Sequence, residues 1–346
     1  MDYDKVSFED TLAKNVLATG KCVGCGACVL VCPFNCLEYV KEKPSLVKKC
    51  EICGVCAQAC PKYNWSWSEA ENFVFNKKRS IEEKFGIYRR LVVAKAKDGR
   101  IFEASQNGGI VTALLLFALK NRLIDGAIVS GTSKQKPFLP IPKLATTFKE
   151  ILECAGTRYF YSPNVLALAQ VDKQKKVNVA FVGTPCHINA IRRMQISSLK
   201  EYTSPLKILI GLMCSECFTY EDFLNKQIQQ KLGLNSQKIK KISIKGKVLL
   251  TTESGTKILS LNEARKYARK SCYFCCDFSS ELADISAGDL GLHGWTFTII
   301  RTDKGEELFS RAEKAGVIKT RKADREMDAL KLLNKLSEKK KRVLTK

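Results

Sequence analysis

Two stretches of the chain repeat one arrangement of cysteines, C-x2-C-x2-C-x3-C-P: CVGCGACVLVCP at 22–33 and CEICGVCAQACP at 50–61. Three thiolates at this spacing, separated by small residues, let the backbone curl around a cubic iron–sulfur cluster, and the fourth reaches the neighbouring cluster. We therefore predict two [4Fe–4S] clusters, with zinc or disulfides as the alternatives. The expected ligands are Cys22, Cys25, Cys28 and Cys60 for one cluster and Cys50, Cys53, Cys56 and Cys32 for the other.

The remaining composition favours metal binding over disulfides. The chain of 346 residues contains 16 cysteines, and its opening MDYDKVSFEDTLAKN lacks the features of a secretory leader. We therefore expect a cytoplasmic protein, in which CxxC spacings indicate metal sites. Cys36 belongs to neither set and is expected to pack as a small apolar residue. No apolar run reaches the roughly 18 residues that a membrane span requires.

The charge balance predicts an acidic partner. The 58 Lys and Arg against 35 Asp and Glu give a formal net charge of +23. Anionic lipid, another subunit and a polyanionic small molecule are candidates, and a surface charged only for solubility is the alternative. Nucleic acid is a poor candidate, because the basic residues accompany no nucleic-acid-binding motif.

A further set of cysteines follows apolar strands in the second half of the chain. Cys186 comes after the predicted strand NVAFVG and the turn GTP, and Cys214 follows the strand LKILIGL. Because the carboxyl ends of strands in an α/β sheet converge on one crevice, these thiols are expected to meet there. A CxxC hairpin, Cys272 to Cys275, would complete a third cluster, with Cys217 in reserve for Cys214.

Two other roles for Cys186 stay open at this point. A nucleophile paired with the adjacent His187 is one, although neighbouring residues on a helix point in different directions and no nucleophile signature surrounds them. Simple packing is the other. Zinc in place of the cluster is also possible, but it could not carry electrons.

Two segments of the same region could bind an anion. SQNGG, at 105–109, directly precedes an apolar helix expected at about 110–121, and free backbone N–H groups at a helix start suit phosphate. An ordinary capped helix is the alternative, since the segment is not a GxGxxG fingerprint. Near a glycine turn at 156, Arg158 could bind a phosphate or carboxylate, or it could be solvated at the surface.

Five segments resemble, in order across about 89–295, the family of beta subunits of coenzyme F-420 hydrogenases and dehydrogenases. They are SQNGGIVTALLLFAL, AGTRYFYSPNVLAL, FVGTPCHINAIRR, IGLMCSECFTYEDF and CYFCCDFSSELADISAGDLG. The doubled cysteine motif is similar to bacterial two-cluster ferredoxins over about 15–65. In layout, the chain is most similar to the F-type subunits of reduced coenzyme F-420 dehydrogenases, the input modules of membrane complexes that reduce methanophenazine or a quinone.

The resemblance implies an FAD and a coenzyme F-420 site beside an iron–sulfur cluster. It carries over Cys186, Cys214, Cys272 and Cys275 as cluster ligands, and the doubled cysteine at 275–276 leaves two thiolates available for the last position. The implied FAD contacts are Ser105, Gln106, Gly108, Gly109, Thr112, Thr157, Arg158, Tyr159, Thr184 and Pro185.

The implied function is oxidation of reduced coenzyme F-420 by hydride transfer to FAD, with electrons passing through the clusters to a partner. FAD suits this task because it accepts an electron pair and releases single electrons. A soluble ferredoxin:coenzyme F-420 oxidoreductase and a non-catalytic electron-transfer adaptor are the alternatives. No catalytic side chain is assigned, because hydride transfer requires no acid or base. Lys266, Arg269 and Lys270 are expected to guide the anionic coenzyme, or else to form a solvated helix face.

We expect an α/β fold in several parts. The linker should pack Trp65, Trp67, Phe73 and Phe75 against its neighbours. The basic tail, with Ala323, Met327, Leu330, Leu333 and Leu336 at helical intervals, should form an amphipathic helix that lies on anionic lipid at the cytoplasmic membrane face, docks to an acidic subunit or packs on its own domain. The expected parts are a two-cluster ferredoxin-like domain (1–64), the linker (65–88), an FAD and coenzyme F-420 domain (89–310) and the tail (311–346).

Overall fold

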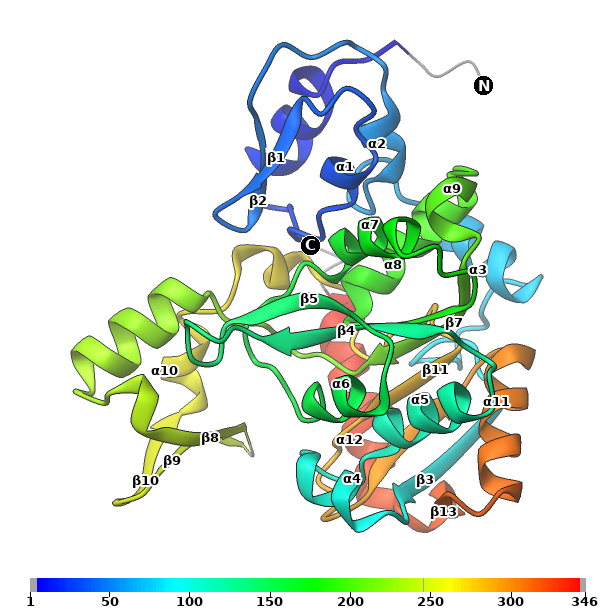
Figure 1. Ribbon diagram of the computed structural model, residues 1–346, viewed down its shortest axis with the longest axis vertical. Helices are drawn as coiled ribbons and strands as arrows, with labels where there is room; N and C mark the ends of the chain where they lie inside the picture. The colour runs from blue at the N-terminus through cyan, green and yellow to red at the C-terminus, as the bar shows by residue number, and fades with distance from the viewer. Residues whose placement is uncertain (1–4, 245, 343–346) are drawn as a thin grey trace.

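The computed structural model of the protein describes residues 5–244 and 246–342. Its centre is an eight-stranded sheet in the order β13-β3-β12-β11-β7-β6-β4-β5 (Figure 1). The neighbours β11, β7, β6 and β4 run parallel, and the flanking strands pair antiparallel. The strands are β3 (Arg90–Ala96), β4 (Gly126–Thr132), β5 (Pro140–Ala145), β6 (Val179–Gly183), β7 (Leu206–Leu212), β11 (Ile285–Gly288), β12 (Thr296–Ile300) and β13 (Ile318–Lys322).

Helices cover both faces of this sheet, so the α/β architecture predicted from the sequence is confirmed. One face carries α4 (Gly99–Ala104), α5 (Ile110–Lys120), α6 (Phe148–Glu153) and α11 (Asp303–Lys314). The other carries η2 (Asn164–Ala167), α7 (Leu168–Lys173), α8 (Pro185–Ile196), α9 (Lys200–Thr203) and α12 (Met327–Lys341), the last preceded by η6 (Ala323–Arg325). Strand β6 is buried along its whole length, which explains its unbroken apolar sequence.

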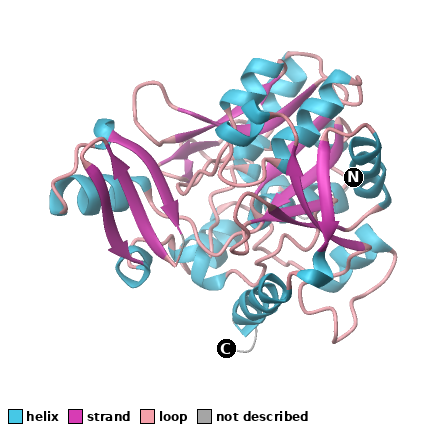
Figure 2. Cartoon of the chain, turned by 90° about the horizontal axis from the view of Figure 1, so that it is seen from below, coloured by secondary structure: helices cyan, strands magenta, loops and turns pink. Residues whose placement is uncertain are grey.

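A smaller lobe projects from the main sheet. Its antiparallel sheet, β8-β9-β10, stands apart from the central one (Figure 2). The lobe has a core of its own, in which Phe218 and Phe223 stack with ring centroids 4.5 Å apart. Its elements are η3 (Tyr220–Lys231), η4 (Ser236–Lys238), β8 (Ile239–Ile244), β9 (Lys247–Thr252), β10 (Gly255–Ser260) and α10 (Leu261–Arg265).

The N-terminal unit, drawn in blue in Figure 1, packs directly on the main domain. One apolar core runs through the junction, because Val23 and Ala27 pack together with Val165 and Leu168. A side chain at Gly26 would come within 2.6 Å of Leu166. The unit consists of η1 (Glu9–Leu17), α1 (Ala27–Leu30), β1 (Leu37–Val40), β2 (Lys43–Leu46) and α2 (Val55–Ala59).

The segment expected as a linker contains a helix, α3 (Trp67–Phe75), which begins where the Ser66 hydroxyl accepts a hydrogen bond from Glu69 N–H. Trp65, Trp67 and Phe75 pack against the junction core as predicted. Phe73 does not: half of it is exposed, because it lies on the outer side of α3.

The expected tail is part of the main domain. The boundary drawn at residue 310 falls inside α11, and β13 continues the central sheet by pairing with β3. Ala323, Leu330, Leu333 and Leu336 pack against the core around Phe297, whereas Met327 is exposed. The apolar face of α12 is therefore covered by its own domain. Residues 343–346 of this stretch lie outside the described residues.

Within residues 5–244 and 246–342, no helix combines the length and apolar character needed to cross a membrane.

At Gly108 the chain passes close to the backbones of β3 and β12, and this contact leads to a prediction about stability. A Cβ there would lie 2.7 Å from the Ala94 carbonyl oxygen of β3 and 2.8 Å from the Thr296 amide nitrogen of β12. Because both are backbone atoms of the sheet, Gly108→Ala should lower the free energy of unfolding by about 1–3 kcal/mol. Urea denaturation followed by circular dichroism measures this change.

Gly99→Ala is the matched control, because a Cβ at this helical position meets no atom within 4 Å. It should leave stability unchanged or raise it by roughly 0.4–1 kcal/mol. Equal denaturation midpoints for the two variants would contradict the steric account of Gly108.

Candidate functional site

The carboxyl ends of the parallel strands meet at one edge of the sheet, as expected. Strand β6 leads into the turn before Cys186, and its neighbour β7 leads into Cys214. Helix α8 starts at this point with Thr184 as its N-cap, and the Thr184 hydroxyl lies 3.1 Å from the Cys186 sulfur. The fold thus brings together loops that are far apart in sequence.

Four thiols gather at this edge, and we call them the third cysteine group: Cys186, Cys214, Cys272 and Cys275. Burial raises the pKa of Cys186, opposed by the Thr184 hydrogen bond, and the neighbouring Cys214 and Cys272 thiols raise it further. Burial also raises the pKa of Cys275, which lies near Cys186. Clustered, buried thiols that favour the neutral form are the arrangement a cationic iron–sulfur core would stabilise as thiolates.

Cys217 and Cys276, the alternative ligands to Cys214 and Cys275, differ in their surroundings. The sulfur of Cys217 lies 3.9 Å from that of Cys214, and the Cys217 N–H faces the Cys272 sulfur at 3.4 Å. Cys276 instead lies near Lys62, Asp277 and Glu281 as well as Cys275. Both thiols have charged neighbours, but the thiol that acts on Cys275 is that of Cys186, whereas the thiol that acts on Cys276 is that of Cys275.

The prediction of a hairpin around Cys272 and Cys275 is wrong. The Cys272 N–H donates to the Arg269 carbonyl at 2.9 Å, and the Cys275 N–H donates to the Cys272 carbonyl at 3.3 Å. These local bonds coil the segment into a helical turn, η5 (Lys270–Phe274).

His187 is not arranged to activate Cys186. Its Nδ1 accepts a hydrogen bond from Thr184 N–H at 3.2 Å, which closes the capping box of α8. Its ring stacks on Tyr161 at 4.9 Å between centroids. Burial lowers the pKa of His187 to about 3, so the ring is neutral and serves the helix start.

A cavity of about 390 Å³ opens beside the third cysteine group, a size within the range of cofactor sites. Cys214 and Cys217 line its wall, as does Met213. Eight of the ten residues expected to contact FAD also line it: Ser105, Gln106, Gly109, Thr112, Thr157, Arg158, Tyr159 and Thr184.

The other two expected contacts do not line the cavity. Gly108 faces the backbones of β3 and β12, so its small size is required by strand packing and not by a ligand. Pro185 is buried as the first residue of α8, where its fixed backbone angle suits a helix start.

Arg158 is the fixed cation of this cavity. Its guanidinium donates to the carbonyls of Ala155 at 3.0 Å and Gly156 at 3.2 Å, and to the Thr132 hydroxyl at 3.1 Å. Burial lowers the pKa of Arg158. Its partners are neutral oxygens, so its positive charge is left to be balanced by an anion.

Sequence reasoning missed several polar residues of the wall. Asn164 is buried and joins two strands by bonding the Ser130 hydroxyl and the Val182 carbonyl. Arg265 pairs with Glu216 at 3.0 Å on the lobe side. No local sequence pattern distinguishes these residues from surface residues. The possible signal was Glu216, a charged residue two positions after Cys214.

Two cavity residues hold the small lobe in place. The Tyr159 hydroxyl accepts the Ile244 N–H at 3.2 Å, and the Gln106 amide donates to the Ser243 hydroxyl at 3.3 Å. Both contacts reach the end of β8, so the lobe closes one side of the cavity.

The N-terminal cysteines lie close together in the two groups that the motif predicts as ligand sets. The pKa of Cys28 is raised well above its usual value by burial and by the Cys25, Cys60 and Cys22 thiols around it. Burial raises the pKa of Cys56 to about 12, with the thiols of Cys53, Cys50 and Cys32 adding to the shift. A small cavity is lined by all four members of this second set: Cys32, Cys50, Cys53 and Cys56.

The first N-terminal set lies against the third cysteine group. The Cys186 thiol contributes to the raised pKa of Cys25, after burial and the Cys60 and Cys22 thiols. Tyr161 stands between them, with its hydroxyl 3.9 Å from the Cys186 sulfur. The two sets are therefore neighbours across the junction of the two domains.

Arg269 ties these two sets together. Its backbone N–H donates to the Cys217 carbonyl at 2.9 Å, and its guanidinium donates to the Val23 carbonyl at 2.8 Å, between Cys22 and Cys25. The guanidinium also pairs with Glu42 at 3.2 Å and stacks on Tyr161 at 3.9 Å. A Cβ on Gly24 would lie 2.5 Å from this guanidinium, so the glycine leaves room for it.

The expectation that Arg269 guides a soluble coenzyme is therefore wrong, because its side chain is buried in the domain junction. Its neighbours Lys266 and Lys270 are exposed, as expected of either a guiding or a solvated face.

Comparison with known proteins agrees with this architecture. Residues 91–169 and 177–326 match the N-terminal and C-terminal family models described as coenzyme F420 hydrogenase/dehydrogenase, beta subunit. Residues 16–38 match a 4Fe-4S binding domain.

Three similar proteins illustrate the match. The beta subunit of the coenzyme F420 hydrogenase of Methanothermobacter thermautotrophicus is 37% identical over 74% of this chain and 92% of its own length. A subunit of the F(420)H(2) dehydrogenase of Methanosarcina mazei is 29% identical over 83% of this chain and 81% of its own. A chain of the F420-reducing [NiFe] hydrogenase complex from Methanosarcina barkeri superposes with a TM-score of 0.71 at 33% identity, covering 75% of this chain and 90% of that one.

Replacing Arg269 in the domain junction should have a large effect on the free energy of unfolding. Arg269→Met leaves the Val23 carbonyl and the Glu42 carboxylate without their buried partner, which should lower the free energy of unfolding by about 1–3 kcal/mol. Lys270→Met changes an exposed neighbour and should stay within about 0.5 kcal/mol of the wild type. Urea denaturation of both variants tests this, and a shift shared by the two would argue against the junction role.

Proposed function

The chain belongs to the family of coenzyme F420 hydrogenase/dehydrogenase beta subunits, and on this basis we propose that it oxidises reduced coenzyme F420 by hydride transfer to a bound FAD. We further propose that it passes the electrons through [4Fe–4S] clusters to other subunits of a membrane complex that reduces methanophenazine or a quinone. The observation that carries this proposal is the cavity that combines the expected FAD contacts with Cys214 of the third cysteine group.

The residues of the cavity fit the proposed cofactor. Bound FAD would take up an electron pair and give up single electrons, the chemistry needed between a hydride donor and iron–sulfur clusters. Arg158, held by neutral partners, would balance a phosphate. Gly109 and Thr184 line the cavity at the starts of α5 and α8, where the positive ends of the helix dipoles would favour a phosphate.

The third cysteine group supplies four ligands for a further cluster in this proposal. The Cys214 thiol raises the pKa of both Cys186 and Cys272, so it lies near both of them. Cys275 completes the set in this proposal, since the Cys186 thiol acts on it, whereas the thiol that acts on Cys276 is that of Cys275. Within the described residues, no three His, Cys, Asp or Glu side chains are grouped tightly enough for a single metal ion.

From the positions of the two N-terminal cysteine sets, we infer an order for the electron path. The set of Cys22, Cys25, Cys28 and Cys60 adjoins the third cysteine group through Arg269 and Tyr161. The other set lies farther out, where Phe34 and Ile52 are about half exposed. We propose that electrons leave at this outer set.

One observation bears on the alternatives. The leucines of α12 pack on its own domain and Met327 is exposed, so the described part of this helix offers little apolar surface to lipid. Membrane attachment would then depend on partner subunits, and a soluble ferredoxin:coenzyme F420 oxidoreductase remains the second candidate. An adaptor without its own substrate would have no use for the cavity.

Anaerobic mixing with reduced coenzyme F420 tests the function. The flavin and cluster absorbance should bleach on mixing, and NADH in parallel should produce no comparable change. A preference for NADH would overturn the substrate, and a protein that holds its clusters but no FAD would favour the adaptor.

Substituting the adjacent cysteines Cys275 and Cys276 one at a time tests which of them is a cluster ligand. Wild-type protein prepared anaerobically should contain about twelve iron atoms per chain, and Cys275→Ala should lose about four of them. Cys276→Ala should keep all of them, because this thiol lies away from the other three. Iron analysis measures both. A wild-type content of about eight would limit the clusters to the N-terminal domain.

A further inference from the structure

The last turn of α12 reaches the third cysteine group. The Lys340 ammonium donates a hydrogen bond to the Cys272 carbonyl at 3.3 Å, although the two residues are separated by 68 positions. One turn earlier, Leu336 lines the main cavity. The helix that the sequence presents as a basic tail therefore contributes to both halves of the site.

Besides the Cys272 carbonyl, the Lys340 ammonium has several thiols of this group as neighbours. Burial acts to lower its pKa, but the thiols of Cys275, Cys214 and Cys272, together with Glu216, reverse the effect and raise it. The Cys217 thiol raises the pKa of Cys214, and burial raises the pKa of Cys272 and of Cys275; the Lys340 ammonium acts against each of these shifts. One positive charge thus faces three of the four thiols.

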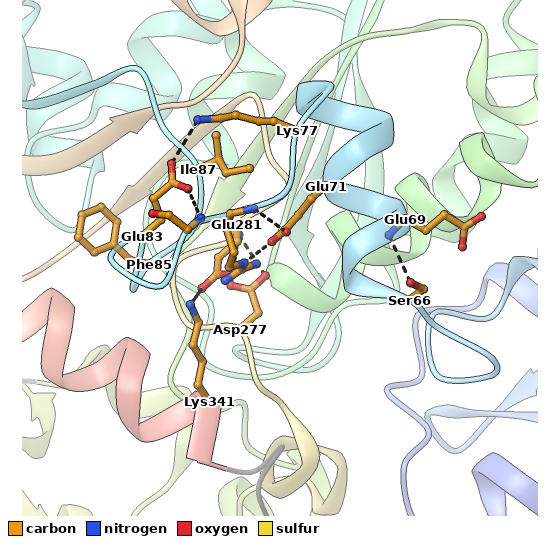
Figure 3. A network of polar contacts seen from close by, with 12 residues as sticks. Ser66, Glu69, Glu71, Lys77, Glu83, Phe85, Ile87, Asp277, Glu281 and Lys341 are labelled. Carbon is orange, nitrogen blue, oxygen red and sulfur yellow. Dashed lines mark hydrogen bonds and ion pairs between the residues drawn. The ribbon is translucent and has the colours of Figure 1, made fainter.

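Neighbouring residues hold the last turn of α12 in this position. Lys341 pairs with the buried carboxylate of Glu281 at 3.4 Å, and Figure 3 shows it reaching from the helix toward that residue. Glu281 is itself held by Arg79, which also binds Glu71. On the outer side, Glu338 pairs with Lys84 at 2.7 Å. With both flanks anchored, Lys340 has little freedom to move away.

Other charges near the group occupy different sides of it. Lys62 donates to the Phe274 carbonyl at 3.3 Å and faces Cys275 and Cys276. Arg269 faces Cys186 from the domain junction. Glu216 is near Cys214, and Asp277 is near Cys275. Lys340 is set apart from the other cations by its closeness to Cys214 and Cys272 together.

We propose that Lys340 is a positioning residue whose fixed charge raises the reduction potential of the cluster held by Cys186, Cys214, Cys272 and Cys275, so that α12 tunes electron transfer. The inference rests on the third cluster of the proposed function. One-electron reduction adds a negative charge to a cluster, and a nearby cation in a poorly solvated site stabilises that added charge.

Lys340→Gln tests the charge while keeping a hydrogen-bond donor for the Cys272 carbonyl. In anaerobically prepared full-length protein, a redox titration followed by electron paramagnetic resonance resolves the clusters, and the signal missing from Cys275→Ala identifies the third. At a fixed potential, the reduced-to-oxidised ratio of that cluster should fall about tenfold, a shift of about 59 mV for one electron. The N-terminal cluster signals should titrate as in the wild type.

Two further variants make the result specific. Lys339→Gln removes the charge of an exposed neighbour on the same helix and should leave the potential unchanged. Lys340→Arg retains the charge and should restore most of the wild-type potential. Should Lys340→Gln lose the third cluster, retention of that cluster in Lys340→Arg would still support the charge, and its loss from both would overturn the proposal.

The failure of this inference can be told apart from failure of the proposed function. About twelve iron atoms in wild type and Lys340→Gln, with the same potential in both, would overturn the role of Lys340 and leave the third cluster standing. About eight iron atoms in the wild type would remove the third cluster, and the inference with it.

Discussion

The parallel pairing of β6, β7 and β11 organises the functional part of the molecule. Because parallel neighbours end at the same edge, the loops after β6 and β7 deliver Cys186 and Cys214 to one place, and the same edge opens into the cavity. The fold thus places the cavity and the third cysteine group at strand ends, where α/β sheets commonly form their binding sites.

The junction between the domains is part of one continuous apolar core. A shared apolar core joins α1 and α2 to η2 and α8, and within it Arg269 satisfies a backbone carbonyl between two cysteines of the N-terminal unit. Its charge is balanced by Glu42 and its plane lies on Tyr161. Electron transfer weakens steeply with distance, so a rigid junction that keeps two cysteine sets adjacent has a direct functional value.

Positive charges from distant parts of the chain lie near the third cysteine group. Buried thiols gain from nearby cations, and the cations come from three separate places: Lys62 after the N-terminal motif, Arg269 before the CxxC, and Lys340 near the C-terminal end of α12. The large positive charge of the chain is therefore partly internal, and only the remainder is available to acidic partners. Family membership supports such partners, since the similar proteins are named as subunits of larger enzymes.

Local sequence was enough to predict the two N-terminal cysteine sets, the α/β architecture and the strand ends that carry Cys186 and Cys214, because each depends on spacing within a short segment or on local periodicity. Packing of the whole chain was needed to establish that Gly108 serves the sheet, that Arg269 is buried in a junction and that α12 reaches a cysteine group. These outcomes rest on contacts between residues such as Val23 and Arg269, which lie 246 positions apart. No local pattern encodes such a contact, because it arises only when separately formed elements pack and exclude water together.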